Sequence, residues 1–228
     1  MNNQEIINNE EKMKNSEKIE VLLVTFGHGQ MGYDIRIKDD TATIADYLAA
    51  LDYFAQQYMT DCQGCDGCCH ERAPLTILDI EPLASLLQQS QYSAHQVITA
   101  FAYIEVFADG AIDISLKRNH QYGCYFLDSK NKICTQHQAR PFVCRSHFCL
   151  AKSEQAQALR SIIANKGMDA LIHLLWHEQQ AGADKILPLL DPSDYENDYL
   201  RDKRSYDQVI LKDILPADFW RQIYKDTI

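Results

Sequence analysis

The sequence predicts an α+β fold that is mainly helical, in a single domain with small β-hairpins and a cysteine-rich metal site joining two loop segments. Apolar residues recur at helical spacing over 43–58 and 151–180, whereas two short stretches alternate with period two around glycine turns. The 8 cysteines fall into two groups. With 228 residues, 46% of them hydrophobic, the chain is long enough to bury a sizeable core.

The first 18 residues are rich in Asn, Glu and Lys and lack the apolar segment of a secretory signal, so we expect a disordered tail at 1–18. Residues 19–26 are apolar and β-branched, which indicates a strand. The GHGQMG at 27–32 matches the GxGxxG of a dinucleotide-binding turn, but that turn requires a helix to follow. Residues 33–38 alternate instead, so the glycines are expected to form a hairpin turn.

The remaining elements follow from apolar spacing and from residues that begin and end helices. Thr43 is the expected N-cap of the helix over 43–58, which leads directly into the first cysteine group. We further expect helices over 80–89 and 93–103, a hairpin over 107–116 turning at Asp109-Gly110, a helix over 151–180 interrupted at Gly167, and a last helix opening at Ala217 or Asp218. These elements predict a cysteine-cluster metal-binding domain at 19–150 and a helical extension packed on it at 151–228.

The composition argues against several classes of protein. A formal charge of −10 with scattered basic residues argues against binding nucleic acid. No stretch reaches the ~18 consecutive apolar residues of a membrane helix, so we expect no membrane partner. The cysteines could pair as disulfides, but that pattern is typical of small secreted proteins without a large core. We therefore expect a cytoplasmic protein whose reduced thiols are metal ligands.

The first cysteine group is Cys62, Cys65, Cys68 and Cys69. Cysteines two residues apart in a tight turn can face one ion, and the glycines between them give the backbone the necessary freedom. A CxxCxxC run with a fourth ligand from elsewhere is typical of ferredoxin-type iron–sulfur sites. Adjacent side chains point in different directions, so Cys68 and Cys69 are not expected to bind the same ion. One of them would serve a second metal or be a buried thiol.

The second group, in a stretch predicted to be irregular loops, is Cys124, Cys134, Cys144 and Cys149. Together the two groups offer enough thiolates for two four-coordinate ions or for one cubane cluster with spares. Arg140 and Arg145 are expected to bind such a cofactor, because guanidinium groups stabilise the negative charge of a thiolate-bound centre. The alternative for both is a surface ion pair with a carboxylate.

Histidines offer few further ligands. His70, His137 and His147 lie close to cysteines in the sequence, but with 8 thiols present they are expected to remain outside the ligand set. His173 and His177 lie four residues apart on a predicted helix, without the glutamate of HExxH or a third nearby ligand. We interpret them as a partly buried helix face.

The CxxCxxCC run followed by C-x-F-L-x(6)-C-x(5)-R-P-x-x-C-R-x-x-x-C resembles the YkgJ-type family of cysteine-cluster proteins, which are described as zinc- or iron-chelating. The resemblance covers about residues 60–150. The residues that carry it are Cys62, Cys65, Cys68, Cys69, Cys124, Phe126, Leu127, Cys134, Arg140, Pro141, Cys144, Arg145 and Cys149. Flagellin lysine N-methylases, regarded as iron–sulfur proteins, have a similar cysteine arrangement. The resemblance implies metal chelation and specifies no reaction.

Two cofactors and three functions follow from these features. The CxxCxxC run with a remote fourth ligand favours a [4Fe–4S] cluster, whereas two times four cysteines favour Zn²⁺. We expect a redox or metal-handling accessory protein. The alternatives are an enzyme resembling the lysine N-methylases, although the chain has no recognisable methyl-donor site, and a zinc-stabilised module whose helical C-terminal region binds a protein partner.

Overall fold

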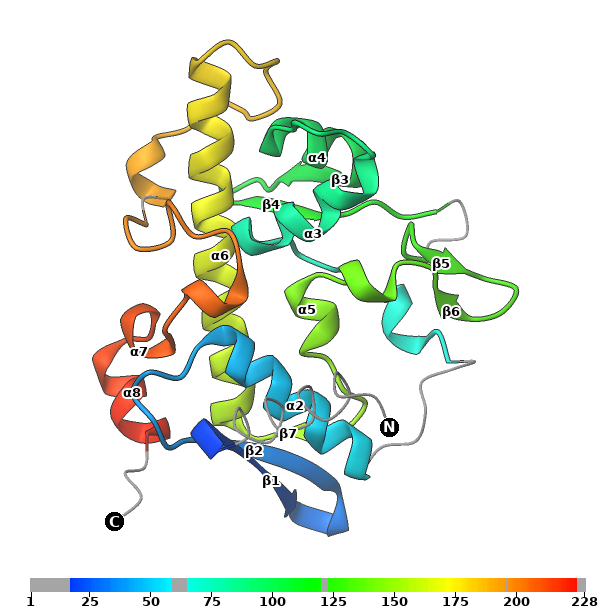
Figure 1. The fold of residues 1–228 in the computed structure, drawn as a ribbon, viewed down its shortest axis with the longest axis vertical. Coiled ribbons are helices and arrows are strands. Elements are labelled where there is room, and N and C mark those ends of the chain that lie inside the picture. The colour runs from blue at the N-terminus through cyan, green and yellow to red at the C-terminus, as the bar shows by residue number, and fades with distance from the viewer. Residues whose placement is uncertain (1–16, 59–64, 120–122, 196, 225–228) are drawn as a thin grey trace. The chain divides into compact units, whose positions relative to one another are not determined.

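The computed structural model describes residues 17–58, 65–119, 123–195 and 197–224 (Figure 1). As predicted, the fold is α+β, with helices predominating over small sheets of two or three strands. The predicted tail lies almost entirely outside the described residues. The chain divides into a first unit (1–61, 148–163 and 206–228) and a second unit (62–147 and 164–205). The domain boundary predicted after residue 150 stays a prediction.

The first unit is built on a three-stranded sheet. β1 (Ile19–Thr25) and β2 (Met31–Ile37) form the predicted antiparallel hairpin. The glycines between them make a short 3-10 turn at Gly27–Gly29, and a strand follows, not a helix. The hairpin is therefore confirmed, and the context of a dinucleotide-binding turn is lacking. β7 (Ala151–Lys152), which the sequence did not predict, pairs in parallel with β2.

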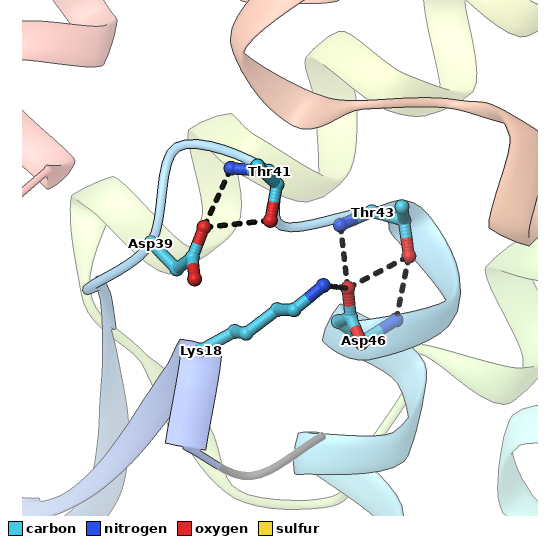
Figure 2. A network of polar contacts seen from close by, with 5 residues as sticks. All are labelled: Lys18, Asp39, Thr41, Thr43 and Asp46. Atoms are coloured by element: carbon cyan, nitrogen blue, oxygen red, sulfur yellow. Dashed lines mark hydrogen bonds and ion pairs between the residues drawn. The ribbon is translucent and has the colours of Figure 1, made fainter. Parts of the chain in front are cut away.

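The helix α2 (Ile44–Tyr58) begins at a capping box (Figure 2). The carboxylate of Asp46 accepts hydrogen bonds from the Thr43 backbone N–H at 2.8 Å and from the Thr43 hydroxyl at 2.9 Å. The Thr43 hydroxyl in turn accepts the Asp46 N–H at 3.2 Å, so Thr43 is the N-cap as predicted. The Lys18 ammonium lies 3.3 Å from the same carboxylate. This buried acid therefore has both donors and a counter-charge.

Two short helices complete the first unit. α7 (Leu211–Ile214) follows an antiparallel bridge between Thr43 and Ile210. α8 (Ala217–Ile223) opens at the first of its two predicted starting positions. Its last residue, Ile223, is buried, so the C-terminal segment contributes to the core of this unit.

The second unit contains α3 (Ile80–Ala84), α4 (Ala94–Phe101) and a hairpin of β3 (Ala102–Val106) and β4 (Ile112–Leu116). The helix predicted over 80–89 is too long, because the chain tightens into a 3-10 turn after Ala84 and leaves it through Gln88 at a φ of +54°. The hairpin predicted over 107–116 begins earlier, since the β-branched and aromatic segment after α4 forms its first strand. The turn at Asp109-Gly110 is confirmed.

The longest helix, α6 (Glu154–Gln180), has its first residues in the first unit and the rest in the second. It starts later than predicted because the Ser153 hydroxyl caps it, accepting the Ala156 N–H at 3.0 Å. The predicted interruption at Gly167 is wrong. A Cβ added to Gly167 would lie 2.6 Å from the Cβ of Thr76, so this glycine permits close packing within the second unit. None of the described helices is both long and apolar enough to span a membrane.

Substitution of Gly167 by alanine should destabilise the protein. Alanine improves helix propensity by about 1 kcal/mol, but overpacking against the buried Thr76 costs about 1–3 kcal/mol. Chemical denaturation measures the difference, with Gly27→Ala as the control because no atom lies within 4 Å of a Cβ there. A Gly167→Ala protein as stable as wild type would contradict the packing argument.

Candidate metal centre

The two cysteine groups meet through the backbone of the second unit. The N–H of Cys124 donates to the carbonyl oxygen of Cys69 at 2.7 Å. The side chain of Asn119 holds the residue before Cys124, because its Oδ1 accepts the Gly123 N–H at 3.0 Å. The two loop segments therefore come together at Cys69 and Cys124, as the sequence predicted.

Cys68 and Cys69 lie in a 3-10 turn at Gly67–His70, in which the Cys69 N–H donates to the Asp66 carbonyl at 2.9 Å. Their thiols are joined by a hydrogen bond. This bond lowers the pKa of Cys68 to about 6 and raises the pKa of Cys69. The adjacent cysteines are thus chemically distinct, with Cys68 the better thiolate.

The second group supplies three more thiols to this region. Cys124 follows Gly123, whose N–H is bound by Asn119, Cys134 lies in β6 (Ile133–Cys134) opposite β5 (Leu127–Asp128), and Cys144 lies in α5 (Phe142–Arg145). Burial, followed by the charges of Cys124, Asp79 and Cys68, raises the pKa of Cys144 to about 12.

Burial and the charge of neighbouring thiolates also raise the pKa values of Cys69 and Cys124. Burial raises the pKa of Cys124, and negative charge on Cys134 and Cys68 raises it further. The pKa of Cys69 is raised first by the hydrogen bond to Cys68, then by burial. Negative charge on Cys124 and Cys134 raises it further. Five thiols are therefore linked by pairwise electrostatic interactions, namely Cys68, Cys69, Cys124, Cys134 and Cys144.

Three predicted ligands are not part of this set. Cys62 lies outside the described residues. Cys65 is exposed, and Cys149 is an exposed residue of the first unit that interacts electrostatically with Lys152. The seven cysteines that the structure describes are all free thiols. Among the described residues, no three His, Cys, Asp or Glu side chains are arranged so that they could hold a metal ion together.

Two arginines act on the thiols. The positive charge of Arg140, together with the hydrogen bond from Cys69, lowers the pKa of Cys68. The same charge partly offsets the increase that burial causes in the pKa of Cys144. Arg118, which was not predicted from the sequence, partly offsets the increase that burial causes in the pKa of Cys124. It lies outside the motif and reaches the site through a β-bridge with Cys124 and a 3.0 Å hydrogen bond from its guanidinium to the His70 carbonyl. Arg145 is half-buried in α5, next to Cys144.

The histidines have other surroundings. His70 lies 3.3 Å from the Asp66 carboxylate, and the His137 carbonyl accepts the Arg140 Nε–H at 3.2 Å. His147 is half-buried. On α6, His173 and His177 pack with ring centroids 4.5 Å apart and line a small cavity of about 30 Å³ together with Asn197 and Arg201. His173 is buried, in agreement with the interpretation of a partly buried helix face.

The chemistry of the crowded thiols fits a thiolate-bound metal. Deprotonated cysteine is the ligand of both structural zinc and iron–sulfur clusters. Thiolates that repel one another are stabilised by a cation among them, and by the guanidinium groups of Arg118 and Arg140. A family model described as "CxxCxxCC: Putative zinc- or iron-chelating domain" matches residues 61–162.

Residues 61–162 are therefore similar to the CxxCxxCC domain. The matched segment begins immediately before the first cysteine group, includes both groups, and ends within α6. No curated protein and no solved structure matches the chain in the other two comparisons.

The thiol pair predicts a pH-dependent reactivity in the reduced, metal-free protein. Iodoacetamide should alkylate Cys68 faster than Cys69 or Cys144 at neutral pH, because only the thiolate is nucleophilic. The rate at Cys68 should fall as the pH drops below about 6, where its thiolate becomes protonated. Peptide mass spectrometry after timed alkylation measures this, with Cys68→Ser as the control. Equal rates at Cys68 and Cys144 would contradict the assignment.

Proposed function

We propose that the CxxCxxCC domain binds metal through thiols of both cysteine groups, with a [4Fe–4S] cluster as the occupant, in a cytoplasmic protein that serves as a redox or metal-handling accessory. The observation that carries the proposal is the convergence of thiols from both cysteine groups around the hydrogen bond from Cys124 to Cys69. Segments more than fifty residues apart thereby bring like charges together, an arrangement that a bound cation stabilises.

The proposed ligands begin with the CxxCxxC run, in which Cys62, Cys65 and Cys68 supply three thiolates and the second group supplies a fourth. A bound iron–sulfur cluster would provide one-electron chemistry. The Cys69 thiol donates a hydrogen bond to the Cys68 sulfur, and hydrogen bonds to ligand sulfurs tune the potential of such centres. Arg140, beside Cys68 and Cys144, offsets the negative charge of the thiolates.

Zinc is the second candidate, and the irregular backbone of the second group favours it. Between Cys124 and Cys149 the described elements are two-residue strands, a 3-10 turn and a helix of one turn. Closed zinc sites supply folding free energy to segments of this kind, and two zinc ions would use all eight thiols.

Anaerobic purification followed by assays for iron, acid-labile sulfide and zinc separates the two occupants. A brown protein with about four iron and four sulfide per chain would establish the [4Fe–4S] cluster. A colourless protein with stoichiometric zinc would exclude the cluster and establish the zinc site. A purified protein that contains neither, and takes up neither after reconstitution, would refute the proposal.

Substitution of Cys144 by serine should remove most of the bound metal and loosen the segment from 124 to 149, because a serine hydroxyl is a poor substitute for a thiolate ligand. Metal content per chain and limited proteolysis of this segment measure the two effects. His173→Ala is the matched control, since its side chain is buried on α6 outside the thiol cluster. Equal metal content in both variants would exclude Cys144 as a ligand.

A further inference from the structure

A buried carboxylate connects the scaffold of the second unit to the helix that carries Cys144. The side chain of Asp79 is fully buried. One of its oxygens accepts the Thr76 backbone N–H at 2.7 Å and the Thr76 hydroxyl at 2.8 Å. The other accepts the backbone N–H of Phe142 at 2.7 Å, from a segment 63 residues away. Both carboxylate oxygens are thus committed to protein donors, which a buried acid requires.

The capping box of Asp46 in the first unit shows which of the hydrogen bonds to Asp79 are needed for helix capping alone. Thr43 and Asp46 form the same T-x-x-D arrangement as Thr76 and Asp79, with the same two donors on one carboxylate oxygen (Figure 2). Beyond the box, Asp46 is bound by a Lys18 ammonium on a half-exposed side chain, whereas Asp79 is bound by the Phe142 N–H. The bond to Phe142 is therefore additional to helix capping.

The Phe142 N–H lies at the start of the one-turn helix α5. A single turn is not stable alone, because helix nucleation costs more than one hydrogen bond returns. The Cys144 N–H bonds back to the Pro141 carbonyl at 3.0 Å, and the buried Phe142 side chain anchors the turn. The Asp79 bond fixes where this turn begins, and so where Cys144 lies relative to Cys68 and Cys124.

Thr76, the other residue of the Asp79 capping box, is packed closely against α6. Gly167 of α6 leaves no room for a Cβ against Thr76, whose side chain is buried. The position of Asp79 is therefore set by packing on α6 at one end and transmitted to α5 at the other. A displacement of the carboxylate would move α5.

We propose that Asp79 is a positioning residue of the thiol centre, which holds α5 so that Cys144 can serve as a metal ligand without binding the metal itself. This inference rests on the proposed function. Residues that orient metal ligands change metal affinity about 10–100-fold when they are replaced. A residue that only caps a helix changes stability and leaves the metal site unaltered.

The test compares Asp79→Asn with Asp46→Asn in the full chain. The Thr76 and Phe142 N–H groups bind different oxygens of Asp79, and asparagine replaces one of these oxygens by an NH₂ donor, so it loses one of the two bonds. The reduced, chelator-treated proteins are titrated with Co²⁺ under anaerobic conditions, and the thiolate-to-cobalt charge-transfer bands are recorded. Amide hydrogen exchange of residues 142–146 is measured in parallel on the metal-free proteins.

Asp79→Asn should weaken Co²⁺ binding about 10–100-fold, change the charge-transfer spectrum and speed amide exchange over residues 142–146. Asp46→Asn should lower the melting temperature and leave all three unchanged. If wild type binds Co²⁺ and Asp79→Asn matches it in affinity and spectrum, the inference is overturned and the proposed function stands. If wild type binds no Co²⁺, the variants are compared by the iron–sulfur cluster they take up on anaerobic reconstitution, and a wild type that takes up neither refutes both the proposed function and the metal-positioning role.

A variant with milder effects covers the case in which Asp79→Asn does not fold. Asp79→Glu retains the charge and adds one methylene, which displaces α5. It should alter the Co²⁺ charge-transfer spectrum of a folded protein. A folded Asp79→Glu protein with the wild-type spectrum and affinity would overturn the inference.

Discussion

Repulsion among thiolates that share one region is the constraint on which the centre in the second unit depends. Each of the pKa values of Cys69, Cys124 and Cys144 is raised by a neighbouring cysteine as well as by burial. Such a group of thiols is stable when its negative charge is neutralised, by protons in the metal-free chain or by a bound cation. The guanidinium groups of Arg118 and Arg140 supply part of the balance.

Single hydrogen bonds to backbone groups, more than regular secondary structure, hold the cysteine segments in place. Asn119 accepts the N–H of the residue before Cys124, the Cys69 carbonyl accepts the Cys124 N–H, and Asp79 accepts the N–H that begins α5. Each of these bonds acts on one short segment. The centre is thus assembled from loops whose positions are set individually, which is compatible with a structure that tightens when metal binds.

Patterns that act locally were predictable from the sequence. The hairpin at 19–37, the Thr43 cap and the turn at Asp109-Gly110 each depend on neighbouring residues, and the structure has all three. The interruption at Gly167 was a wrong prediction for a physical reason. Glycine lowers helix propensity, but here the cost is outweighed by packing against Thr76, which no local pattern shows.

In the candidate site too, residues in a local motif were predictable and residues that act through long-range contacts were not. Motif spacing led to the cysteines and to Arg140, and the structure places each of the five clustered thiols within electrostatic range of a thiol from the other group. Arg118 and Asp79 were not assigned to the site, because they reach it through a bridge and a hydrogen bond between distant segments. The repeated T-x-x-D pattern was the available signal for Asp79, since a second capping box marks a second buried carboxylate.

X-ray absorption at the iron and zinc edges of the anaerobically purified protein reports the atoms bound to the metal, and so tests whether the thiols are its ligands. We expect a first shell made of sulfur, at about 2.3 Å if the metal is zinc. A first shell of nitrogen and oxygen, or the absence of bound iron and zinc after anaerobic reconstitution, would contradict it.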